Sequence, residues 1–466
     1  SRSGTNFLYS SINSTQQALI DDGSSIGELR INYLRGNTAN EEDILEGPDP
    51  AEEKILRIRP QTTSTGGGIV HNAKLGTIAN AAPVFIGIPQ AVGRFGGAWP
   101  RADGETYLDF QREQLNRDPS VLVAANDGML HLFDAQTGDE RFAYVPNLVF
   151  SKLSVFSDPG YRHQFYVDST PSVNDAYISV DGIVAPAWNT ILVGGLGAGG
   201  RGYYALNITD PENFTRDDVM WEFGPEDDPD ATTDNDGNVI SDMGLSFGQP
   251  VIAMSNAVDN NNNQKWVAIF GNGYNSTSEE GNAVIYMLFI DEGYDGWSDV
   301  GDLVKIDTGI GGIANPNGIS DVRAVDLDGN GTVDRIYAGD LLGNLHVVDV
   351  SSPNQTSWDD AGNKFILYRA KYSQTNEEQP ITTRPIVVNN ERGAGLVVVF
   401  ATGRFFAVAD AVDPRIQSIY GVIDDLSNTE VSADELTEQV LTNEVFQLNA
   451  DESIDVRVLT DNTVSN

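Results

Sequence analysis

Short apolar runs and turn residues alternate along most of the chain. From about residue 75 onward, each apolar run ends in a cluster of Gly, Asn and Asp, and a second strand-like run follows it. The clearest unit joins residues 121–125 to residues 129–134 through the turn Asn126, Asp127 and Gly128. These turn residues tolerate the positive φ that tight hairpins need. The pattern predicts β-hairpins and an all-β fold with minor helical insertions.

The same order of strand, turn and return strand recurs further along the chain. Other units begin near Ile191, Lys265, Arg335 and Leu396, and their first strands are close to continuously apolar. A strand that is apolar on both faces must lie between other sheets, and the radially packed blades of a propeller provide that environment. The rhythm predicts a β-propeller of about six to eight blades. Two stacked β-sandwiches are the alternative.

Both ends of the chain depart from this rhythm. Before the repeat, helices are expected around residues 15–19 and 50–58. After it, a helix is expected at residues 431–441, because Ser432 and Glu435 have the spacing of a capping box. We therefore divide the chain into a lead-in segment that packs on the propeller, the propeller itself, and a C-terminal extension or incomplete last blade: residues 1–74, 75–424 and 425–466.

The composition removes several classes of function. The formal net charge is −40, with 68 acidic against 28 basic residues, so nucleic acid and anionic lipid are repelled. This excess reflects a solvated surface, carboxylates that converge on hard cations, or both. The absence of Cys rules out disulfides, thiolate metal sites and cysteine nucleophiles. No apolar run is long enough for a transmembrane helix, and a chain that begins at Ser1 without Met is expected to be part of something longer.

The strongest chemical signal is a stretch of nine residues with oxygen-bearing side chains at every second position. These residues are Asp326, Asp328, Asn330, Thr332 and Asp334. Alternate positions converge when a loop wraps around a calcium ion, with the backbone carbonyl acting at the seventh position and Gly allowing the bend at the sixth, here Gly331. The twelfth position holds Tyr337 instead of the Glu of an EF-hand. The sequence therefore predicts a calcium loop between two strands, with a solvated hairpin as the alternative.

A weaker version of this pattern lies at residues 234–242, within an acidic, turn-rich insertion. Its oxygen side chains match positions one, three, five and nine, but Val239 stands at the sixth position and resists the bend. An acidic surface loop is the favoured interpretation, and a second ion stays open.

Residues for catalysis are scarce. His71, His131, His163 and His346 are scattered and form no metal-binding or catalytic pair in the sequence. His131 and His346 occupy equivalent places in two return strands, which indicates a repeated structural role. The Gly-rich residues 194–202 lack the Lys and the following helix of a phosphate loop and are expected to form a hairpin turn. We expect no catalytic or cofactor-binding residues and no enzyme activity.

Several motifs together resemble one family. They are VLVAANDGMLHLFDAQTGDERFAYVP at 121–146, FGQP at 247–250, FGNGYN at 270–275, VDLDGNGTVDRIYAGDLLGNLHVVDV at 325–350 and VFATGR at 399–404. In combination they resemble the C-terminal region of PilC/PilY proteins, which are type IV pilus biogenesis factors and tip adhesins. The resemblance runs from about Leu75 to Asp424.

The resemblance implies a modified, quinoprotein-like propeller of about seven blades with one calcium ion, held by the five residues between Asp326 and Asp334. In the family, this ion regulates pilus extension against retraction, and the protein supports surface adhesion and twitching motility. The implied partners are minor pilins at the pilus tip and a host or abiotic surface. The implied location is the cell surface or pilus tip, after export, with a periplasmic or outer-membrane pool. Thr77 departs from the family, where an acidic residue is usual, and the resemblance implies that the family's adhesive N-terminal domain is not part of this sequence.

Two other functions compete with this one. A quinone-dependent dehydrogenase on a related propeller would need calcium shared with the cofactor, whereas the expected ligands here all lie within nine residues. A cell-surface carbohydrate-binding propeller would need exposed aromatic residues, for which Trp99, Trp297 and Trp358 are candidates, although such residues more often fill blade interfaces.

Overall fold

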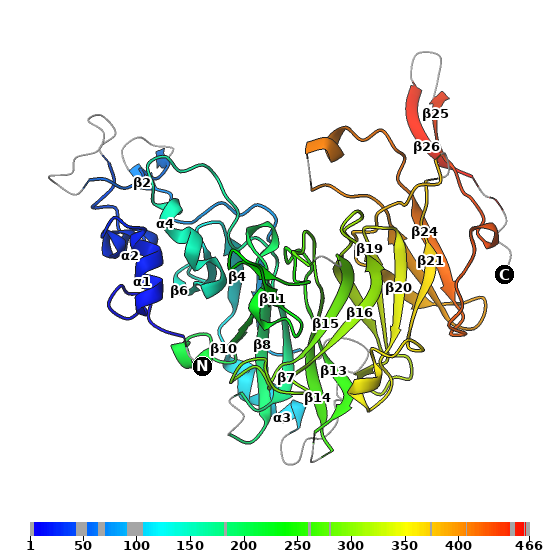
Figure 1. The fold of residues 1–466 in the computed structure, drawn as a ribbon, viewed down its shortest axis with the longest axis horizontal. Coiled ribbons are helices and arrows are strands. Elements are labelled where there is room, and N and C mark those ends of the chain that lie inside the picture. The colour runs from blue at the N-terminus through cyan, green and yellow to red at the C-terminus, as the bar shows by residue number, and fades with distance from the viewer. Residues whose placement is uncertain are drawn as a thin grey trace.

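The computed structural model describes residues 4–42, 54–63, 70–90, 106–180, 184–259, 262–278, 281–372, 375–406, 408–447, 453–460 and 462. Within them, five sheets of three or more strands follow one another along the chain (Figure 1). Each sheet is built from antiparallel strands that follow one another along the chain, except that the short strand β18 (Thr332–Val333), between β17 and β19, joins the third sheet by pairing in parallel with β13. This arrangement is a β-propeller, as the sequence predicts.

The first two sheets contain β3 (Val84–Ile86), β4 (Ser120–Ala125), β5 (Met129–Asp134) and β6 (Glu140–Tyr144), then β7 (Ser172–Ile178), β8 (Ala187–Gly195), β9 (Tyr203–Asn207) and β10 (Val219–Phe223). The third contains β13 (Val251–Val258), β14 (Gln264–Gly271), β15 (Asn282–Phe289) and β16 (Leu303–Gly311). The last two contain β17 (Ile319–Val325), β19 (Arg335–Asp340), β20 (Asn344–Asp349) and β21 (Lys364–Arg369), then β22 (Ile386–Asn389), β23 (Leu396–Ala401) and β24 (Ile419–Asp424).

The first strands of the sheets form the inner ring of the propeller. β7 lies against β13, β13 against β17, and β17 against β22. Proline directly precedes the first strand in four of the five sheets, at Pro83, Pro171, Pro250 and Pro385. Proline lacks the N–H that a ladder needs, so it is tolerated at the start of an edge strand. The described residues form five sheets of three or more strands. The six to eight blades expected from the sequence therefore stay a prediction.

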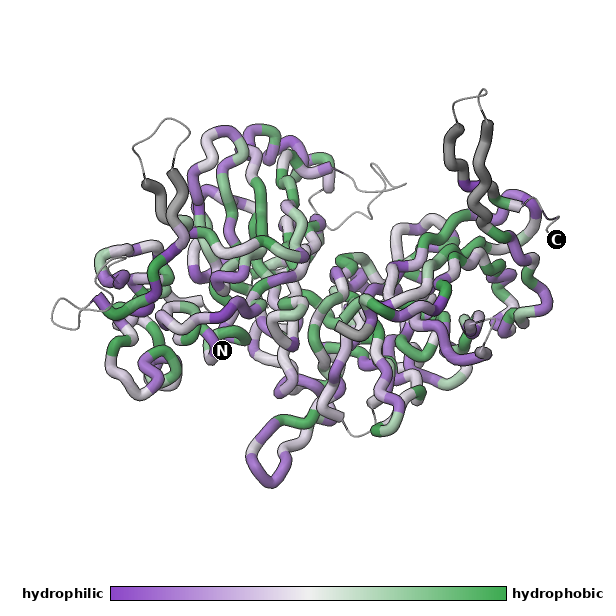
Figure 2. Tube along the Cα trace, turned by 90° about the horizontal axis from the view of Figure 1, so that it is seen from above, coloured by the Kyte–Doolittle hydropathy of each residue, from purple (hydrophilic) through white to green (hydrophobic). Residues whose placement is uncertain are grey.

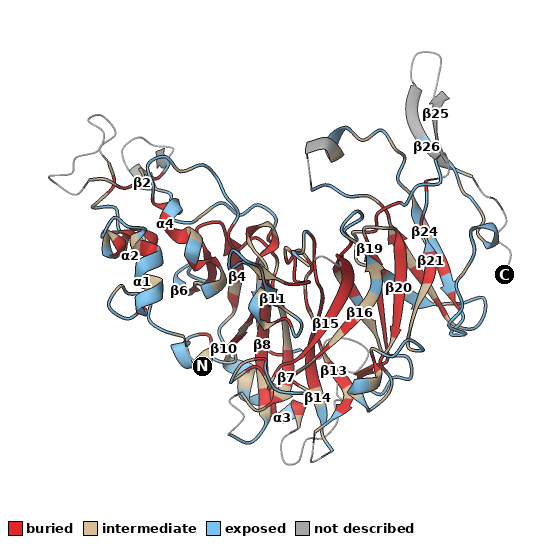
Figure 3. Cartoon of the chain, in the orientation of Figure 1, coloured by how far each residue is buried: buried red, intermediate tan, exposed pale blue. Residues whose placement is uncertain are grey.

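The hydrophobic core lies between successive sheets. All eight residues of β15 are buried (Figure 3), and its alternate side chains belong to two different cores. Val284, Tyr286 and Leu288 pack toward the second sheet, whereas Ile285 and Met287 pack toward the fourth. Burying such a side chain contributes about 1.5–3 kcal/mol. This confirms the prediction that strands apolar on both faces lie between sheets, and Figure 2 shows the apolar stretches within the body of the molecule.

The remaining elements are short. The helices are α1 (Ser14–Asp21), α2 (Gly27–Leu34), α3 (Tyr107–Glu113) and α4 (Leu153–Phe156), with 3₁₀ turns η2 (Gln114–Asn116), η3 (Asn147–Lys152), η4 (Gly197–Gly199), η5 (Arg216–Asp218), η6 (Pro225–Asp227), η7 (Gln355–Ser357), η8 (Val408–Val412) and η9 (Ala433–Glu435). The small strands are β1 (Gln61–Thr63), β2 (Val70–Asn72), β11 (Thr232–Thr233), β12 (Val239–Ile240), β18 (Thr332–Val333), β25 (Leu441–Gln447) and β26 (Ser453–Leu459). None of the described helices is long and apolar enough to cross a membrane.

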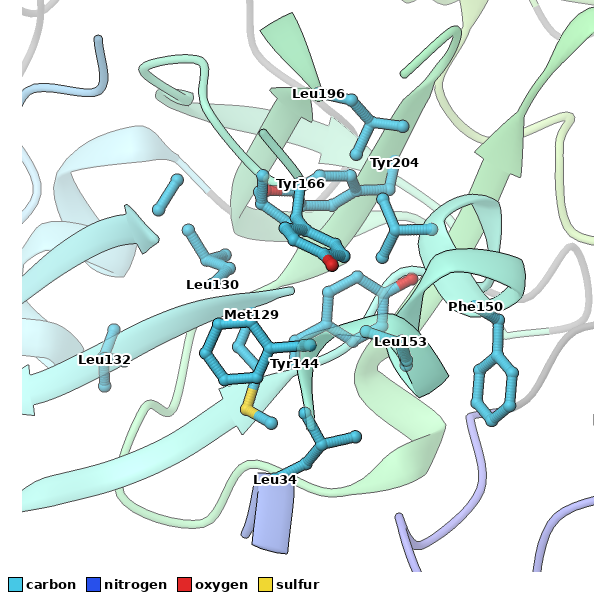
Figure 4. Packing of buried hydrophobic residues seen from close by; sticks show 14 of the residues in the cluster. Leu34, Met129, Leu130, Leu132, Tyr144, Phe150, Leu153, Tyr166, Leu196 and Tyr204 are labelled. Carbon is cyan, nitrogen blue, oxygen red and sulfur yellow. The ribbon is translucent and has the colours of Figure 1, made fainter. Parts of the chain in front are cut away.

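The N-terminal helices pack on the first two sheets. Ile20 and Leu34 join the core that also contains Leu130 and Tyr204, part of which Figure 4 shows. The helix expected around residues 15–19 is confirmed as α1, which Asn13 caps. The division of the chain into three parts stays a prediction.

Two expected helices are wrong. The described part of residues 50–58 is extended, because Leu56 forms a bridge with Glu41 and the N–H of Arg57 donates to the carbonyl oxygen of Ser157 at 2.9 Å; residues 50–53 lie outside the described residues. Of residues 431–441, only the single turn η9 is helical. The capping box of Ser432 and Glu435 does form, but β25 begins at Leu441 and pairs with β26.

Candidate metal centre

The predicted calcium loop joins β17 to β19 and lies where the third and fourth sheets meet. Gly329 and Gly331 have φ of +82° and +96°, a backbone region that other residues rarely adopt. Directly after the second bend, β18 pairs in parallel with β13, with Thr332 opposite Met254. The loop is therefore held at the boundary between two blades.

Three carboxylates converge in this loop. Asp326, Asp328 and Asp334 each offer one oxygen, and these oxygens lie within 4.8 Å of one another. Asp334 is buried, Asp326 is half-buried and Asp328 is exposed. Burial raises the pKa of Asp334, and the negative charges of Asp328 and Asp326 raise it further. A cation at this point would relieve that repulsion, and hard oxygen ligands suit Ca²⁺.

Backbone N–H groups hold the carboxylates in place. Asp326 accepts hydrogen bonds from the N–H of Gly329 at 2.7 Å and of Gly331 at 2.8 Å. Asp334 accepts one from the N–H of Leu327 at 2.8 Å. A carboxylate has about four lone-pair sites, so each group keeps acceptor capacity for an ion.

The other two predicted ligands contact each other. The side-chain oxygen of Asn330 accepts hydrogen bonds from both the N–H and the hydroxyl of Thr332, and the Asn330 amide donates to Asp328 at 3.2 Å. The structure thus brings three of the five predicted side chains into one cluster. Asn330 and Thr332 brace the loop beside it.

Sequence reasoning missed Asn256 of β13. Its amide nitrogen donates to the Asp334 carboxylate at 3.1 Å and to the carbonyl oxygen of Val333 at 2.9 Å. Its oxygen accepts the hydroxyl of Thr332 at 2.7 Å. The polar pair Ser255 and Asn256 interrupts an otherwise mainly apolar strand, which is the signal that could have indicated a special role.

The weaker acidic loop is arranged differently. Asp234 accepts hydrogen bonds from the N–H groups of Asp236 and Asn238 at the tip of the β11–β12 hairpin, whereas Asp242 belongs to a separate cluster with Asp228 and Asp230. The predicted ligands of this loop are therefore not brought together around one point, which favours the surface-loop interpretation.

A lysine occupies this second cluster. The ammonium group of Lys305 lies 2.9 Å from Asp228 and 2.7 Å from Asp242, and also pairs with Asp230. Burial alone would lower the pKa of Lys305, but hydrogen bonds to the three carboxylates raise it. In contrast, no ion pair among the described side chains involves the carboxylates of the predicted calcium loop. Of the two acidic clusters, the one in this loop therefore has no lysine or arginine, within the described ranges, to balance its charge.

Two of the histidines contact acidic side chains within the blades. His131 on β5 lies 2.6 Å from Glu140 and 3.2 Å from Asp127, and His346 on β20 lies 2.7 Å from Asp340. Both histidines are buried on the third strand of their sheets. This confirms the repeated structural arrangement that the sequence predicts.

The aromatic candidates for sugar binding are buried. Trp358 is 0 % exposed and Trp297 is 8 % exposed, and the indole of Trp297 packs edge-on against Trp221 and donates to the carbonyl oxygen of Glu222. Trp99 lies outside the described residues. The two candidates that the structure describes, Trp297 and Trp358, are therefore packed inside the protein and offer no platform for a sugar.

Comparisons with known proteins agree with this architecture. A family model described as the PilY1 beta-propeller domain matches residues 75–457. The chain is 32% identical over 458 residues to a type IV pilus biogenesis factor PilY1 homolog of Xylella fastidiosa, and 31% identical over 476 residues to the type IV pilus biogenesis factor PilY1 of Pseudomonas aeruginosa. These matches cover 93% and 96% of the chain but only 27% and 35% of the relatives.

A solved structure gives the same result. The crystal structure of the Pseudomonas aeruginosa PilY1 C-terminal domain superposes with a TM-score of 0.61 at 30% sequence identity. The match covers 82% of this chain and 74% of that domain.

Proposed function

Since the chain belongs to the PilY1 β-propeller family of type IV pilus biogenesis factors, we propose that it is the calcium-binding propeller of such a factor. The observation that carries the proposal is the convergence of three carboxylates, from Asp326, Asp328 and Asp334, with no cation from the described part of the chain. The module binds and assembles; it is not an enzyme.

Calcium takes about six to eight oxygen ligands. The carboxylates of Asp326, Asp328 and Asp334 supply the charged ones, and the backbone carbonyl of Thr332 adds a neutral one. The side-chain oxygen of Asn330 completes the protein set once it releases the hydrogen bonds that it accepts from Thr332. Water completes the shell beside exposed Asp328. Bound calcium neutralises the mutual repulsion of the carboxylates and fixes a loop that Asn256 ties to the third sheet.

This geometry supports a regulatory role. A ligand that binds only the folded loop stabilises that conformation by mass action. Calcium bound to the loop would therefore make the boundary between the third and fourth sheets more rigid, and this boundary is the surface that a partner would contact. We infer that this boundary faces minor pilins at the pilus tip of the exported protein. There the ion regulates extension against retraction, and hence surface adhesion and twitching motility.

Calorimetric titration tests the site directly. Replacing Asp334 by Ala removes the buried ligand, and we expect calcium affinity to fall by about tenfold or more while the circular dichroism spectrum is unchanged. Asp236→Ala, on the exposed β11–β12 hairpin, is the matched control and should leave affinity as in the wild type. Equal calcium affinity of the Asp334 variant and the wild type would rule out the site.

Motility assays test the role. A bacterium that carries Asp334→Ala in the full-length protein should show altered surface piliation and smaller twitching zones than one that carries Asp236→Ala. If calorimetry confirms the site but both strains twitch like the wild type, the regulatory part of the proposal fails and the metal site stands.

A further inference from the structure

A separate cavity lies on the inner ring of the propeller. Its volume is about 190 Å³, and the strands β7, β13 and β17 line it together with Arg384, which precedes β22. The first strands of three sheets and the entry to a fourth thus meet at one cavity. Inner-ring positions of this kind line the central channel of a propeller.

Two arginines line this cavity. Arg323 is an exposed residue of β17, and its guanidinium forms no hydrogen bond or ion pair with the described residues. Arg384 donates to the carbonyl oxygen of Gln249 and lies 3.1 Å from Asp321. Its Nε is buried and has no hydrogen-bond partner. Guanidinium groups with unused donors are suited to oxygen anions.

The charge of the cavity is opposite to that of the chain. The molecule carries 68 acidic and 28 basic residues, yet two arginines line this cavity, and Asp321 pairs with one of them. One oxygen of Asp321 already accepts both the N–H of Gln249 at 3.1 Å and a guanidinium N–H of Arg384. Asp321 therefore balances at most one of the two positive charges.

The backbone is shaped around this arrangement. The pairing of β17 with β19 shifts register between Ile319 and Val322, so Ser320 and Asp321 form a bulge next to Arg323. Bulges re-aim side chains and are frequent beside functional sites. Here the bulge lies where Asp321 contacts Arg384, and the Arg323 side chain has no partner among the described residues.

We propose that this cavity binds a small oxygen anion between Arg323 and Arg384. Its volume is below the roughly 300 Å³ at which pockets for whole small molecules begin, so it fits one anionic group. That group is a carboxylate or a phosphate, either free or at the end of a longer ligand. Val251 and Val322 line the same cavity beside the two arginines.

Calorimetry and ³¹P NMR line widths with inorganic phosphate test the proposal. Phosphate should bind the wild type, and Arg323→Ala should weaken binding by about tenfold or more. Arg384→Lys keeps a positive charge but loses the donor at Nε and should also weaken it. Arg369→Ala is the matched control. It removes one positive charge from β21, the outermost strand of the sheet that contains Arg323, and should leave phosphate binding unchanged.

A second arm distinguishes the sources of the anion. Acetate and a short peptide with a free C-terminal carboxylate are compared with the same peptide as its amide. Any of these anions that binds the wild type and is lost in Arg323→Ala supports the site, and the tightest one identifies the source. Binding that Arg323→Ala leaves unchanged, or no binding of phosphate, acetate or peptide carboxylate, overturns the proposal.

Discussion

Asn256 holds two residues of the proposed calcium loop from a neighbouring sheet. Its amide holds the Asp334 carboxylate, and its oxygen holds the hydroxyl of Thr332. Both contacts cross from the third sheet to the loop. The residue therefore orients the buried carboxylate of Asp334, as the hydrogen-bond partners of metal ligands generally do.

We expect Asn256→Ala to weaken calcium binding less than Asp334→Ala does. The variant removes the Asn256 donor from the Val333 carbonyl and from one oxygen of the Asp334 carboxylate, whose other oxygen keeps the N–H of Leu327. Losing these hydrogen bonds costs about 1–3 kcal/mol of stability. Calorimetry measures the affinity and urea unfolding the stability. Asn390→Ala, in an exposed turn, is the control and should change neither. If the Asn256 variant bound calcium as tightly as the wild type, the loop would position the Asp334 carboxylate without help from Asn256.

The protonation of His131 makes the free energy of unfolding depend on pH. Burial alone lowers the pKa of His131, but hydrogen bonds to Asp127 and Glu140 raise it from 6.5 to about 9. Because the folded pKa is the higher one, this contribution is fully present below about pH 6.5 and is lost as the pH rises to about 9. Between these values, unfolding should become easier by at most about 1.4 kcal/mol per pH unit from this group.

Urea unfolding between pH 6 and 9.5 measures this effect. The slope should shrink in His131→Gln, which cannot take up the proton. An identical slope in the variant and the wild type would assign the pH dependence to other groups.

Local and distant contacts differ in how well the sequence predicts them. The five loop positions lie within nine residues, so spacing alone was enough to predict that Asp326, Asp328 and Asp334 converge. Asn256 is 78 positions from Asp334, and no spacing rule connects them. The pairing of Lys305 with Asp242 spans 63 positions and was missed for the same reason.

At the scale of elements, Lys305 on β16 fastens the acidic insertion to the third sheet. Asp228 and Asp242 flank the β11–β12 hairpin, and the ammonium group lies between them. Both carboxylates are buried. The insertion is therefore anchored at its base while its tip is exposed.

Lys305→Met should destabilise the fold strongly. It leaves two buried carboxylates without a counter-charge, and breaking a buried ion pair from one side costs about 3–5 kcal/mol. Chemical denaturation gives the value, and Lys371→Met, at an exposed lysine, should cost far less. Equal stabilities of the two variants would mean that the acidic cluster protonates or hydrates at little cost.

Strands were predicted better than helices. The hairpin at residues 126–128 forms as expected, with Gly128 at φ +94°, because turn chemistry and apolar alternation agree there. The capping box at Ser432 also forms, yet the helix stops after one turn. A local start signal does not decide how far a helix continues when the following residues pair as β25 and β26.

At the scale of the whole molecule, contacts between neighbouring sheets connect the proposed calcium loop to the fifth sheet. Arg335, which directly follows Asp334, lies 3.2 Å from Asp424 of β24. The hydroxyl of Tyr337 donates to the same carboxylate at 2.6 Å. Asp334 of the loop is therefore the chain neighbour of Arg335, which forms the contact between the fourth and fifth sheets.

Calcium should stabilise the folded chain as a whole. Binding to the native loop alone contributes about 2.7 kcal/mol at a ligand concentration one hundred times Kd. The melting temperature should therefore rise with added calcium in the wild type and in Asp236→Ala but far less in Asp334→Ala. A rise of the same size in all three proteins would indicate binding elsewhere on the acidic surface.

The most direct test of the central claim is a crystal structure of the protein grown with calcium, with anomalous data collected at a long wavelength. We predict one anomalous peak in the loop, at about 2.3–2.6 Å from carboxylate oxygens of Asp326, Asp328 and Asp334. Calcium-rich crystals that show only water at this loop, with no anomalous signal there, would contradict the account.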